Sequence, residues 1–477
     1  MAPTPGRQLS GFIPLVLLAA AIVASFLASS GPVQWMDNGM FLADAAQGHL
    51  FSESLGPLSH PMYEFFITSV YSLSGSLGLS LINSVLLVPL VALIYALARA
   101  VELSRPLAIL AAVATVLAHS VFWVSTKSEV YVFHTLFVLA AYWLYLNKDL
   151  SLSPAARMFI IGILTGMGVA VHQLTFIVLL PLYVQMLVQF RARIWVTLPG
   201  FALGFAVALP AIIHDLEEGM NLFEIARRFL TGTSPIANEP AWESSMFRFD
   251  MIWHEKNMVT LMMLSFIGPQ LLGLIFFPKT RPLQLLWAAL IMNFIFAISY
   301  NVNDRFTFIL PGVAMASILG ILKLRSWLPD TTAGRALLNL SVLSSPVVLL
   351  SMWGLYSNGL VALPTHSESL PYRNDIHYFM VPYLADRSAE EFVQNYETLA
   401  PAGSIIIGDW TPMGALRSAQ ANGSLQGRTL SMCEDAKDIG IYMTGPGAFL
   451  ARTSYCGNIT ENFRLNKDLM GFRLQAK

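Results

Sequence analysis

The amino-acid sequence predicts an α-helical polytopic membrane protein that ends in an extracytoplasmic α/β domain. Of its 477 residues, 55% are hydrophobic and 12% are charged, and the mean hydropathy is +0.59, whereas roughly 25% of residues are charged in an average soluble domain. The 28 Lys and Arg residues against 29 Asp and Glu residues leave a net charge of −1. Because no basic excess is available to neutralise a phosphate backbone, we expect no nucleic-acid partner.

Long apolar runs divide the chain into two parts. A helix needs about 20 mostly apolar residues to cross a bilayer, and we predict about 11 transmembrane helices. They lie near residues 11–27, 81–100, 107–124, 131–146, 158–171, 174–190, 195–213, 259–277, 283–298, 306–322 and 336–355. We therefore expect a transmembrane domain over residues 1–355, with external loops at 28–80 and 214–258, and a soluble α/β domain over residues 356–477.

Basic residues set the orientation of these spans, because cytoplasmic loops are enriched in Lys and Arg. If the N-terminus is cytoplasmic and successive loops alternate between the two sides, the short external loops contain only two basic residues, Lys127 and Arg305. The opposite side gathers Arg7, Arg99, Arg105, Lys148, Arg157, Arg191, Arg193, Lys279, Arg281, Lys323, Arg325 and Arg335. This partition predicts a multi-pass protein of the inner (plasma) membrane with its C-terminal domain outside.

Two apolar segments allow other interpretations. Residues 62–79 would invert every later loop if they crossed, so we expect an interfacial helix along the outer leaflet. Residues 11–27 also resemble a signal peptide, since Arg7 precedes them and Ala28 and two serines follow. An uncleaved first span is favoured because a multispanning chain needs no cleavage.

The C-terminal region has the patterning of a soluble domain. Residues 388–391 are typical of a capping box that opens a helix, and residues 404–407 of a short buried strand after a Pro-Ala-Gly turn. Cys433 and Cys456 both lie here. Two cysteines in one exported domain indicate a disulfide, with an unpaired structural role as the alternative.

The first external loop contains two acids, Asp37 and Asp44, seven residues apart. If the stretch between them is helical, they share a face. Two such carboxylates can bind a divalent cation, or one can accept a proton from an attacking hydroxyl. Alternatively, Asp37 only caps the helix.

Other external turns add ionisable residues, each with a plainer alternative. Lys127 and Glu129 can bind an anion and orient an acceptor, or form a solvated pair. His60 and His172 are each compatible with a simple hydrogen-bonded role. Arg305 suits bidentate phosphate contact, or anchors the interface beside Asp304.

The convergence of these residues on one side of the membrane is the main functional signal. A transporter would bury ionisable groups near the midplane, whereas the predicted spans hold few. Chemistry at one membrane face fits better. A sugar on a polyprenyl phosphate, presented there by the bilayer, needs an electropositive group at its leaving phosphate and a carboxylate to activate the acceptor.

Several short motifs give the chain a resemblance to a known superfamily. They are Trp35-Met36-Asp37-Asn38-Gly39, His60-Pro61, Phe122-Trp123 followed by Glu129-Val130-Tyr131, Val171-His172-Gln173-Leu174-Thr175, Asp304 before Phe308-Ile309-Leu310-Pro311, and the segment from Leu399 to Asp409. Their order resembles the GT-C superfamily of multispanning glycosyltransferases, and most of all its protein O-mannosyltransferase-like branch, over nearly the whole chain.

This resemblance implies a polyprenyl-phosphate-sugar donor, an inverting displacement, and Asp37 as the base or a metal-site residue. The chain departs from the family pattern at Met40, where the family tends to carry a second acid, and at Met62-Tyr63, which replaces a Pro-Gly step. Either Asp44 takes the place of the missing acid in a divalent-cation site, or the reaction needs no metal.

The sequence thus predicts a membrane glycosyltransferase that acts on a glycan, lipid or protein acceptor at the extracytoplasmic face. Asp37 would be the base, and Lys127 and Arg305 would hold the donor phosphate. The sugar or acceptor would contact Asp44, His60, Glu129 and His172. Two alternatives stay open: a transporter or flippase of lipid-linked saccharides, and a non-catalytic scaffold whose C-terminal domain binds a partner.

Overall fold

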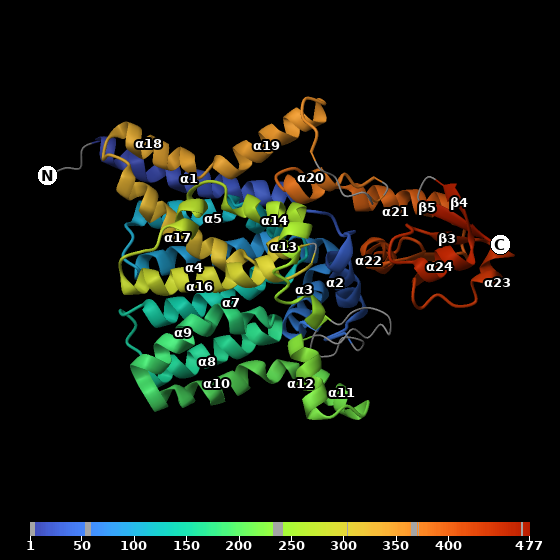
Figure 1. The fold of residues 1–477 in the computed structure, drawn as a ribbon, viewed down its shortest axis with the longest axis horizontal. Helices are drawn as coiled ribbons and strands as arrows, with labels where there is room; N and C mark the ends of the chain where they lie inside the picture. Colours follow the sequence, from blue (N-terminus) through green and yellow to red (C-terminus); the bar gives the residue numbers. More distant parts are fainter. Residues whose placement is uncertain are drawn as a thin grey trace.

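The computed structural model describes residues 5–52, 59–231, 242–302, 304–363, 370, 372–468 and 471–477. Its larger part consists of helices packed side by side, and a smaller part near the C-terminus is built around a β-sheet at one end of the helices (Figure 1). Both parts contribute to the candidate site described below.

The helical part has the following elements in its first half: α1 (Pro5–Ala28), α2 (Met36–Gln47), α3 (Pro61–Ser80), α4 (Ile82–Ala100), α5 (Arg105–Leu117), α6 (His119–Ser125), α7 (Val130–Leu146), α8 (Pro154–Val171), α9 (Leu174–Phe190), η2 (Arg191–Val196), α10 (Thr197–Phe205), η3 (Ala206–Ala208), α11 (Leu209–Glu217) and α12 (Leu222–Thr231). Its second half has η4 (Trp242–Ser245), α13 (Met251–His254), α14 (Lys256–Met263), η5 (Leu264–Phe266), α15 (Pro269–Ile275), α16 (Arg281–Ser299), η6 (Arg305–Thr307), α17 (Leu310–Trp327), α18 (Thr332–Ser341) and α19 (Ser344–Ser357). Proline opens several of them, including α3 and α8, where its missing N–H costs no intrahelical bond.

Within the described residues, four helical stretches are long and apolar enough to cross a membrane: α4, α8, Leu174–Glu217 and α16. The number rises to seven if each of three bent helix pairs is one span. The predicted spans 107–124, 259–277 and 336–355 coincide with these pairs, which bend by 69°, 107° and 59°. The structure therefore supports a helical membrane protein but does not establish eleven spans.

The predicted interfacial segment forms α3, which is not among the candidate spans. Its backbone breaks at Gly75, where φ is 65° and ψ is −166°. Only glycine adopts that combination readily. Gly75 therefore forms a kink that divides α3 into two helical segments.

Close backbone contact joins α8 and α10. Gly162 and Gly166 of α8 face Gly200 and Gly204 of α10, and a Cβ on any of the four would overlap a backbone carbonyl of the other helix. Small residues four apart allow helices to approach closely in a membrane, where lipid tails remove the hydrophobic drive for association.

The C-terminal part contains α20 (Asp375–Met380), α21 (Ser388–Leu399), α22 (Trp410–Ala421), α23 (Ile439–Met443) and α24 (Gly457–Asn462). Its strands are β1 (Ile405–Gly408), β2 (Thr429–Met432), β3 (Ala448–Leu450), β4 (Arg464–Asp468) and β5 (Gly471–Gln475). They form one sheet in the order β2-β1-β3-β5-β4, in which β1 pairs parallel with β2 and β3, and β5 pairs antiparallel with β3 and β4.

Two local predictions for this region meet different outcomes. The buried strand is confirmed as β1, one residue later than expected. The capping box is wrong: α21 begins at Ser388, but the N-cap is Arg387 and makes no side-chain cap. The Ser388 hydroxyl instead donates to Asp386 at 2.8 Å and accepts from the Trp35 indole at 2.9 Å. A contact with the first external loop thus replaces the local cap.

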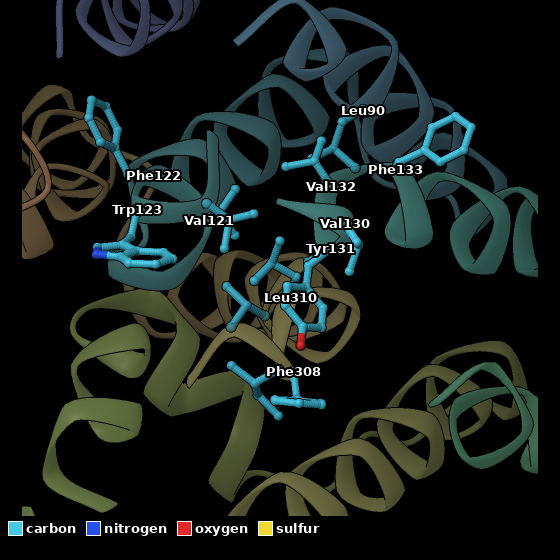
Figure 2. Packing of buried hydrophobic residues seen from close by; sticks show 14 of the residues in the cluster. Leu90, Val121, Phe122, Trp123, Val130, Tyr131, Val132, Phe133, Phe308 and Leu310 are labelled. Carbon is cyan, nitrogen blue, oxygen red and sulfur yellow. The ribbon is translucent and has the colours of Figure 1, made fainter. Parts of the chain in front are cut away.

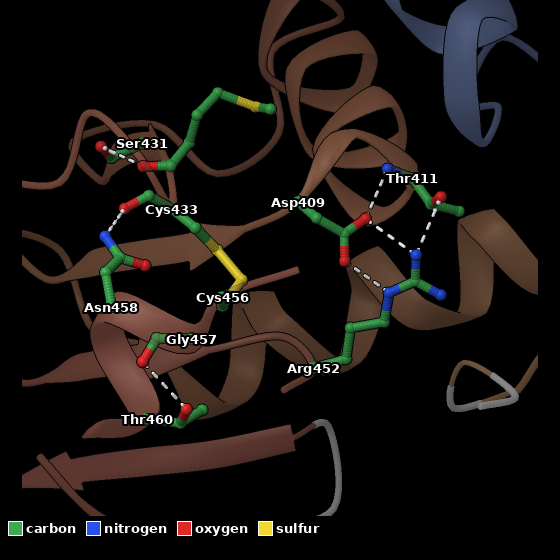
Figure 3. The surroundings of a disulfide bond; sticks show 10 residues. Asp409, Thr411, Ser431, Cys433, Arg452, Cys456, Gly457, Asn458 and Thr460 are labelled. Atoms are coloured by element: carbon green, nitrogen blue, oxygen red, sulfur yellow. Dashed lines mark hydrogen bonds and ion pairs between the residues drawn. A yellow bond between two sulfur atoms is a disulfide. The ribbon is translucent and has the colours of Figure 1, made fainter. Parts of the chain in front are cut away.

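Cys433 and Cys456 form a disulfide, with their Cα atoms 5.3 Å apart (Figure 3). This bond joins the segment after β2 to the start of α24. It lies on a small apolar cluster that also contains Ile405 and Ile407 of β1.

The two parts of the chain meet where α22 packs antiparallel on α2 and the loop before it. The Gln34 backbone N–H donates to the Ser418 hydroxyl at 3.3 Å, and the Asn422 amide donates to the Pro32 carbonyl at 3.2 Å. At the crossing point, a Cβ on Gly39 would overlap the carbonyl of Gly414. The sheet region is therefore docked on the acidic first loop.

Candidate active site

Three carboxylates from distant parts of the sequence come together at the end of the helices that faces the sheet region. Asp37 is the second residue of α2, Glu129 directly precedes α7, and Asp304 directly precedes η6. Burial, followed by the charges of Asp37 and Asp304, raises the pKa of Glu129 well above its usual value. Burial and the charge of Asp37 raise the pKa of Asp304 to about 7. These three acids form the candidate site.

Hydrogen bonds from both backbone and side-chain groups explain why the first loop lies beside Glu129. The Ser30 N–H donates to the Thr126 carbonyl at 2.8 Å, and the Ser128 N–H donates to the Gln34 side chain at 3.0 Å. From α4, the Asn83 amide donates to the carbonyls of Lys127 and Glu129, at 2.7 Å and 2.6 Å. These hydrogen bonds therefore hold the loop before α2 next to the turn between α6 and α7.

Asp37 also receives a hydrogen bond from the sheet region. Its Oδ1 accepts from the indole N–H of Trp410, the first residue of α22. Burial raises the pKa of Asp37, and the hydrogen bond from Trp410 opposes that shift. A carboxylate whose pKa is raised above its usual value holds a proton more strongly, which suits a general base.

Aromatic rings form a wall beside the three acids. The rings of Tyr131 and Phe308 lie 5.0 Å apart, and both residues are seen in Figure 2. The rings of Tyr300 and Phe308 lie 5.1 Å apart. Tyr131 and Tyr300 both interact electrostatically with Asp37 and Asp304. Burial, followed by the charges of Asp304 and Asp37, raises the pKa of Tyr300, so its hydroxyl keeps its proton.

His60 and His172 lie together on this aromatic wall. Their rings stack at 5.1 Å, and His172 is 5.5 Å from Tyr131. The Nδ1 of His60 donates to the Val171 carbonyl at 2.6 Å, while the Nδ1 of His172 accepts from the Leu174 N–H at 3.1 Å. Burial lowers the pKa of His60 to about 4 and that of His172 well below its usual value, so both imidazoles are neutral at physiological pH.

Lys127 points toward the sheet region rather than into open solvent. Its Nζ lies 4.4 Å from the Trp123 ring and 5.0 Å from the Tyr378 ring. It lines a cavity of about 10 Å³ with Asn38, Asp386 and others. Burial lowers the pKa of Lys127 to about 8, and attraction to Asp386 and Glu129 opposes the shift.

Arg305 is occupied by its own loop. Its side chain is buried, with 1% of the residue exposed. It donates to the carbonyls of Val302 and Ile298 at 3.1 Å and 3.3 Å, and to Asn301 Oδ1 at 2.9 Å. In this structure the guanidinium stabilises the turn that carries Asp304, and contact of Arg305 with a donor phosphate stays a prediction.

Asp44 lies apart from the three acids, although α2 is helical as expected. Its nearest ionic partner is His49 at 3.8 Å, and it also interacts with Glu64 and Arg417. A cation shared by Asp37 and Asp44 stays a prediction. In the part of the chain that the structure describes, no group of three or more His, Cys, Asp or Glu residues is placed to hold a metal ion.

Sequence reasoning did not single out Trp410 or Tyr300, and it gave Asp304 only a minor place. Asp304 and Tyr300 belong to the turn in which Arg305 gave the stronger sequence signal. The sequence does contain a feature that points to Trp410. This residue follows a short buried strand, and ligand sites in open α/β sheets lie beyond the carboxyl ends of strands. Only the contact with Asp37 shows that this edge belongs to the site.

Comparison with known proteins identifies the fold. No protein-family model and no curated protein sequence matches the chain. ArnT from Cupriavidus metallidurans bound to undecaprenyl phosphate matches with a TM-score of 0.56 and 13% identity, over 96% of this chain and 97% of that chain. Its apo state matches with a TM-score of 0.55 and 14% identity, over 90% and 87%.

The archaeal oligosaccharyltransferase AglB from Archaeoglobus fulgidus, in complex with an inhibitory peptide and a dolichol-phosphate, matches with a TM-score of 0.46 and 15% identity, over 86% of this chain and 63% of that chain. The likeness to ArnT, a GT-C glycosyltransferase, does not single out the O-mannosyltransferase-like branch. The chain has the fold of the GT-C glycosyltransferase ArnT.

Proposed function

We propose that this protein is an integral membrane glycosyltransferase that transfers a sugar from a polyprenyl-phosphate-linked donor to an acceptor hydroxyl on the extracytoplasmic face. The observation that carries the proposal is the convergence of Asp37, Glu129 and Asp304 at one end of an ArnT-like fold. ArnT itself has been solved bound to undecaprenyl phosphate, which supports a donor of that class here.

The transfer step follows from the charge states of the site. The acceptor hydroxyl gives its proton to Asp37, and its oxygen forms a bond to the anomeric carbon of the sugar. The bond between that carbon and the phosphate oxygen breaks, and its electron pair leaves with the polyprenyl phosphate. Attack opposite the leaving group inverts the anomeric configuration.

The surrounding residues divide the remaining tasks. Burial and the charges of Asp37 and Asp304 raise the pKa of Glu129, and we assign this side chain to hydrogen bonding with the sugar. His60 and His172, neutral and stacked, form a flat wall for the same ring. Lys127 is our candidate for the leaving phosphate, and Arg305 positions the turn that carries Asp304.

No step of this proposal is routed through a metal ion, and Asp44, the second acid suggested for a cation site, interacts with His49 and Glu64. The proposed orientation keeps the N-terminus in the cytoplasm and the sheet region outside. That orientation places the three acids at the external leaflet.

The test is transfer by the purified full chain in detergent, with radiolabelled undecaprenyl-phosphate sugars as donors and bacterial envelope membranes as the acceptor source. We expect Asp37→Asn to abolish transfer while its unfolding temperature stays near that of the wild type. Asp330→Asn is the matched control, because Asp330 is 66% exposed and pairs with Arg325 and Arg335 at the opposite end of α17.

Two outcomes would contradict the proposal. Full transfer by Asp37→Asn would remove the base assignment. Movement of the lipid-linked sugar across vesicles without any transfer would instead identify a flippase.

A further inference from the structure

The N-terminus of α22 lies beyond the carboxyl ends of β1 and β3. The chain leaves β1 through α22 to reach β2 on one side, and then crosses back to β3 on the other side of β1. Asp409 and Trp410 follow β1, and Arg452 follows β3. A point where the strand order reverses is where ligands bind in open α/β sheets, and here it faces the helical part.

A network of polar side chains fixes the first turn of α22. The Asp409 side chain accepts from the Thr411 N–H at 2.9 Å and caps the helix. Arg452 donates to both carboxylate oxygens of Asp409, at 2.5 Å and 2.9 Å, and to the Thr411 hydroxyl at 3.1 Å (Figure 3). Fork-shaped contacts of this kind set geometry as well as energy, so the start of α22 has little freedom.

The position of α22 along α2 is also fixed. Gly39 and Gly414 are in backbone contact, and Ser418 bonds to the loop before α2. With both ends of α22 held, the indole of Trp410 reaches Asp37 across 373 residues of sequence. Trp410 remains 40% exposed as a residue, so its contact with Asp37 is not a by-product of burial in an apolar core.

We propose that Trp410 is a positioning residue of the transferase site, whose indole N–H holds the Asp37 carboxylate in the orientation and charge state that accept the acceptor's proton. The inference rests on the proposed function, because it assumes that Asp37 is the base. It makes the sheet region part of the catalytic unit rather than a separate binding module.

The charges around Asp37 explain why such a donor is needed. Glu129 and Asp304 face it from the turns before α7 and η6, and Tyr131 and Tyr300 face it from α7 and the end of α16. When ionised, each of these four side chains disfavours a negative charge on Asp37. The N–H of Trp410 opposes the effect of burial on the pKa of Asp37. Without this hydrogen bond, Asp37 would stay protonated up to a higher pH.

The test removes the indole N–H, once by replacing the indole with a smaller ring and once with the bicyclic ring kept. Two variants serve: Trp410→Phe, and a full-length chain carrying at position 410 a tryptophan analogue with sulfur in place of the N–H. Loss of a hydrogen bond to a charged group predicts a roughly 10- to 100-fold lower kcat/KM near neutral pH. We expect the acid limb of the pH–rate profile to move to higher pH, with the KM for undecaprenyl-phosphate sugar unchanged.

Trp253→Phe is the matched control, because Trp253 is 84% exposed in α13 and contacts none of the three acids in the described structure. It should leave the profile unchanged. The sulfur analogue keeps the size and shape of tryptophan, so it remains informative even if Trp410→Phe unfolds.

The possible results separate this inference from the proposed function. An acid limb at higher pH in the sulfur analogue supports the role of Trp410. An unchanged profile in that analogue, or an equal loss of rate at every pH, overturns it, while an inactive Asp37→Asn leaves the proposed function in place. Full activity of Asp37→Asn would remove both.

Discussion

Gly39 of α2 and Gly414 of α22 lie in direct backbone contact where the two helices cross. A Cβ on Gly39 would overlap the Gly414 carbonyl, and a Cβ on Gly414 would overlap backbone atoms of Met36. No other residue type permits so close an approach without a shift of one helix. This contact sets the distance between the sheet region and Asp37.

Gly414→Ala should therefore loosen the docking of the sheet region. Overpacking typically costs about 1–3 kcal/mol, and the shift of α22 would withdraw Trp410 from Asp37. We expect a lower unfolding temperature and slower transfer, measured by differential scanning fluorimetry and by the donor assay. Gly440→Ala in α23 is the control, because a Cβ there would meet nothing within 4 Å. Equal behaviour of the two variants would contradict this packing argument.

Asp304 should make stability depend on pH. Its pKa is raised to about 7 in the folded chain, chiefly by burial and then by the charge of Asp37. A raised carboxyl pKa means that its contribution is fully present below the unfolded pKa and is lost as pH rises through about 7. The wild type should therefore lose stability between pH 4 and 8 more steeply than Asp304→Asn, as measured by unfolding temperature.

The control for that comparison is Asp250→Asn. The hydrogen bond from Arg248 lowers the pKa of this exposed carboxyl to about 2, so it stays ionised throughout the same range. Its slope should match that of the wild type. Parallel curves for the wild type and Asp304→Asn would show that Asp304 does not titrate near neutrality.

Arg305→Lys should reveal whether this side chain serves the fold or the donor. A lysine cannot reach the two carbonyls and the amide oxygen that Arg305 binds, and each unmet charged hydrogen bond costs about 1.5–3 kcal/mol. We expect a marked fall in the free energy of unfolding, with Arg105→Lys on the exposed start of α5 as the unaffected control. Unchanged stability with a raised KM for the donor would instead favour direct phosphate binding.

The apolar runs predicted the helical character well because hydrophobicity is a property of neighbouring residues. They did not establish the number of spans. The predicted run at 107–124 is broken between α5 and α6, where Ala118 adopts an extended conformation. Backbone breaks of this kind depend on packing, and an average over about 20 residues does not detect them.

The candidate site combines residues that the sequence could and could not bring together. Counting basic residues predicted that Asp37, Glu129 and Asp304 lie on one side of the membrane, and in the structure these three acids interact electrostatically. The spacing of Asp37 and Asp44 suggested a shared site, but seven residues on a helix set only a common face. The neighbours of that face decide the partners, and Asp44 meets His49 and Glu64 instead.

The sequence by itself determined what local composition controls: which segments avoid water, which loops carry charge, and which region has the pattern of a soluble domain. Tertiary structure alone decided that Trp410 touches Asp37 and that Arg305 binds its own loop. Such contacts depend on the relative placement of whole helices. That placement is set by close backbone contacts, such as the one between Gly39 and Gly414, whose partners lie hundreds of residues apart.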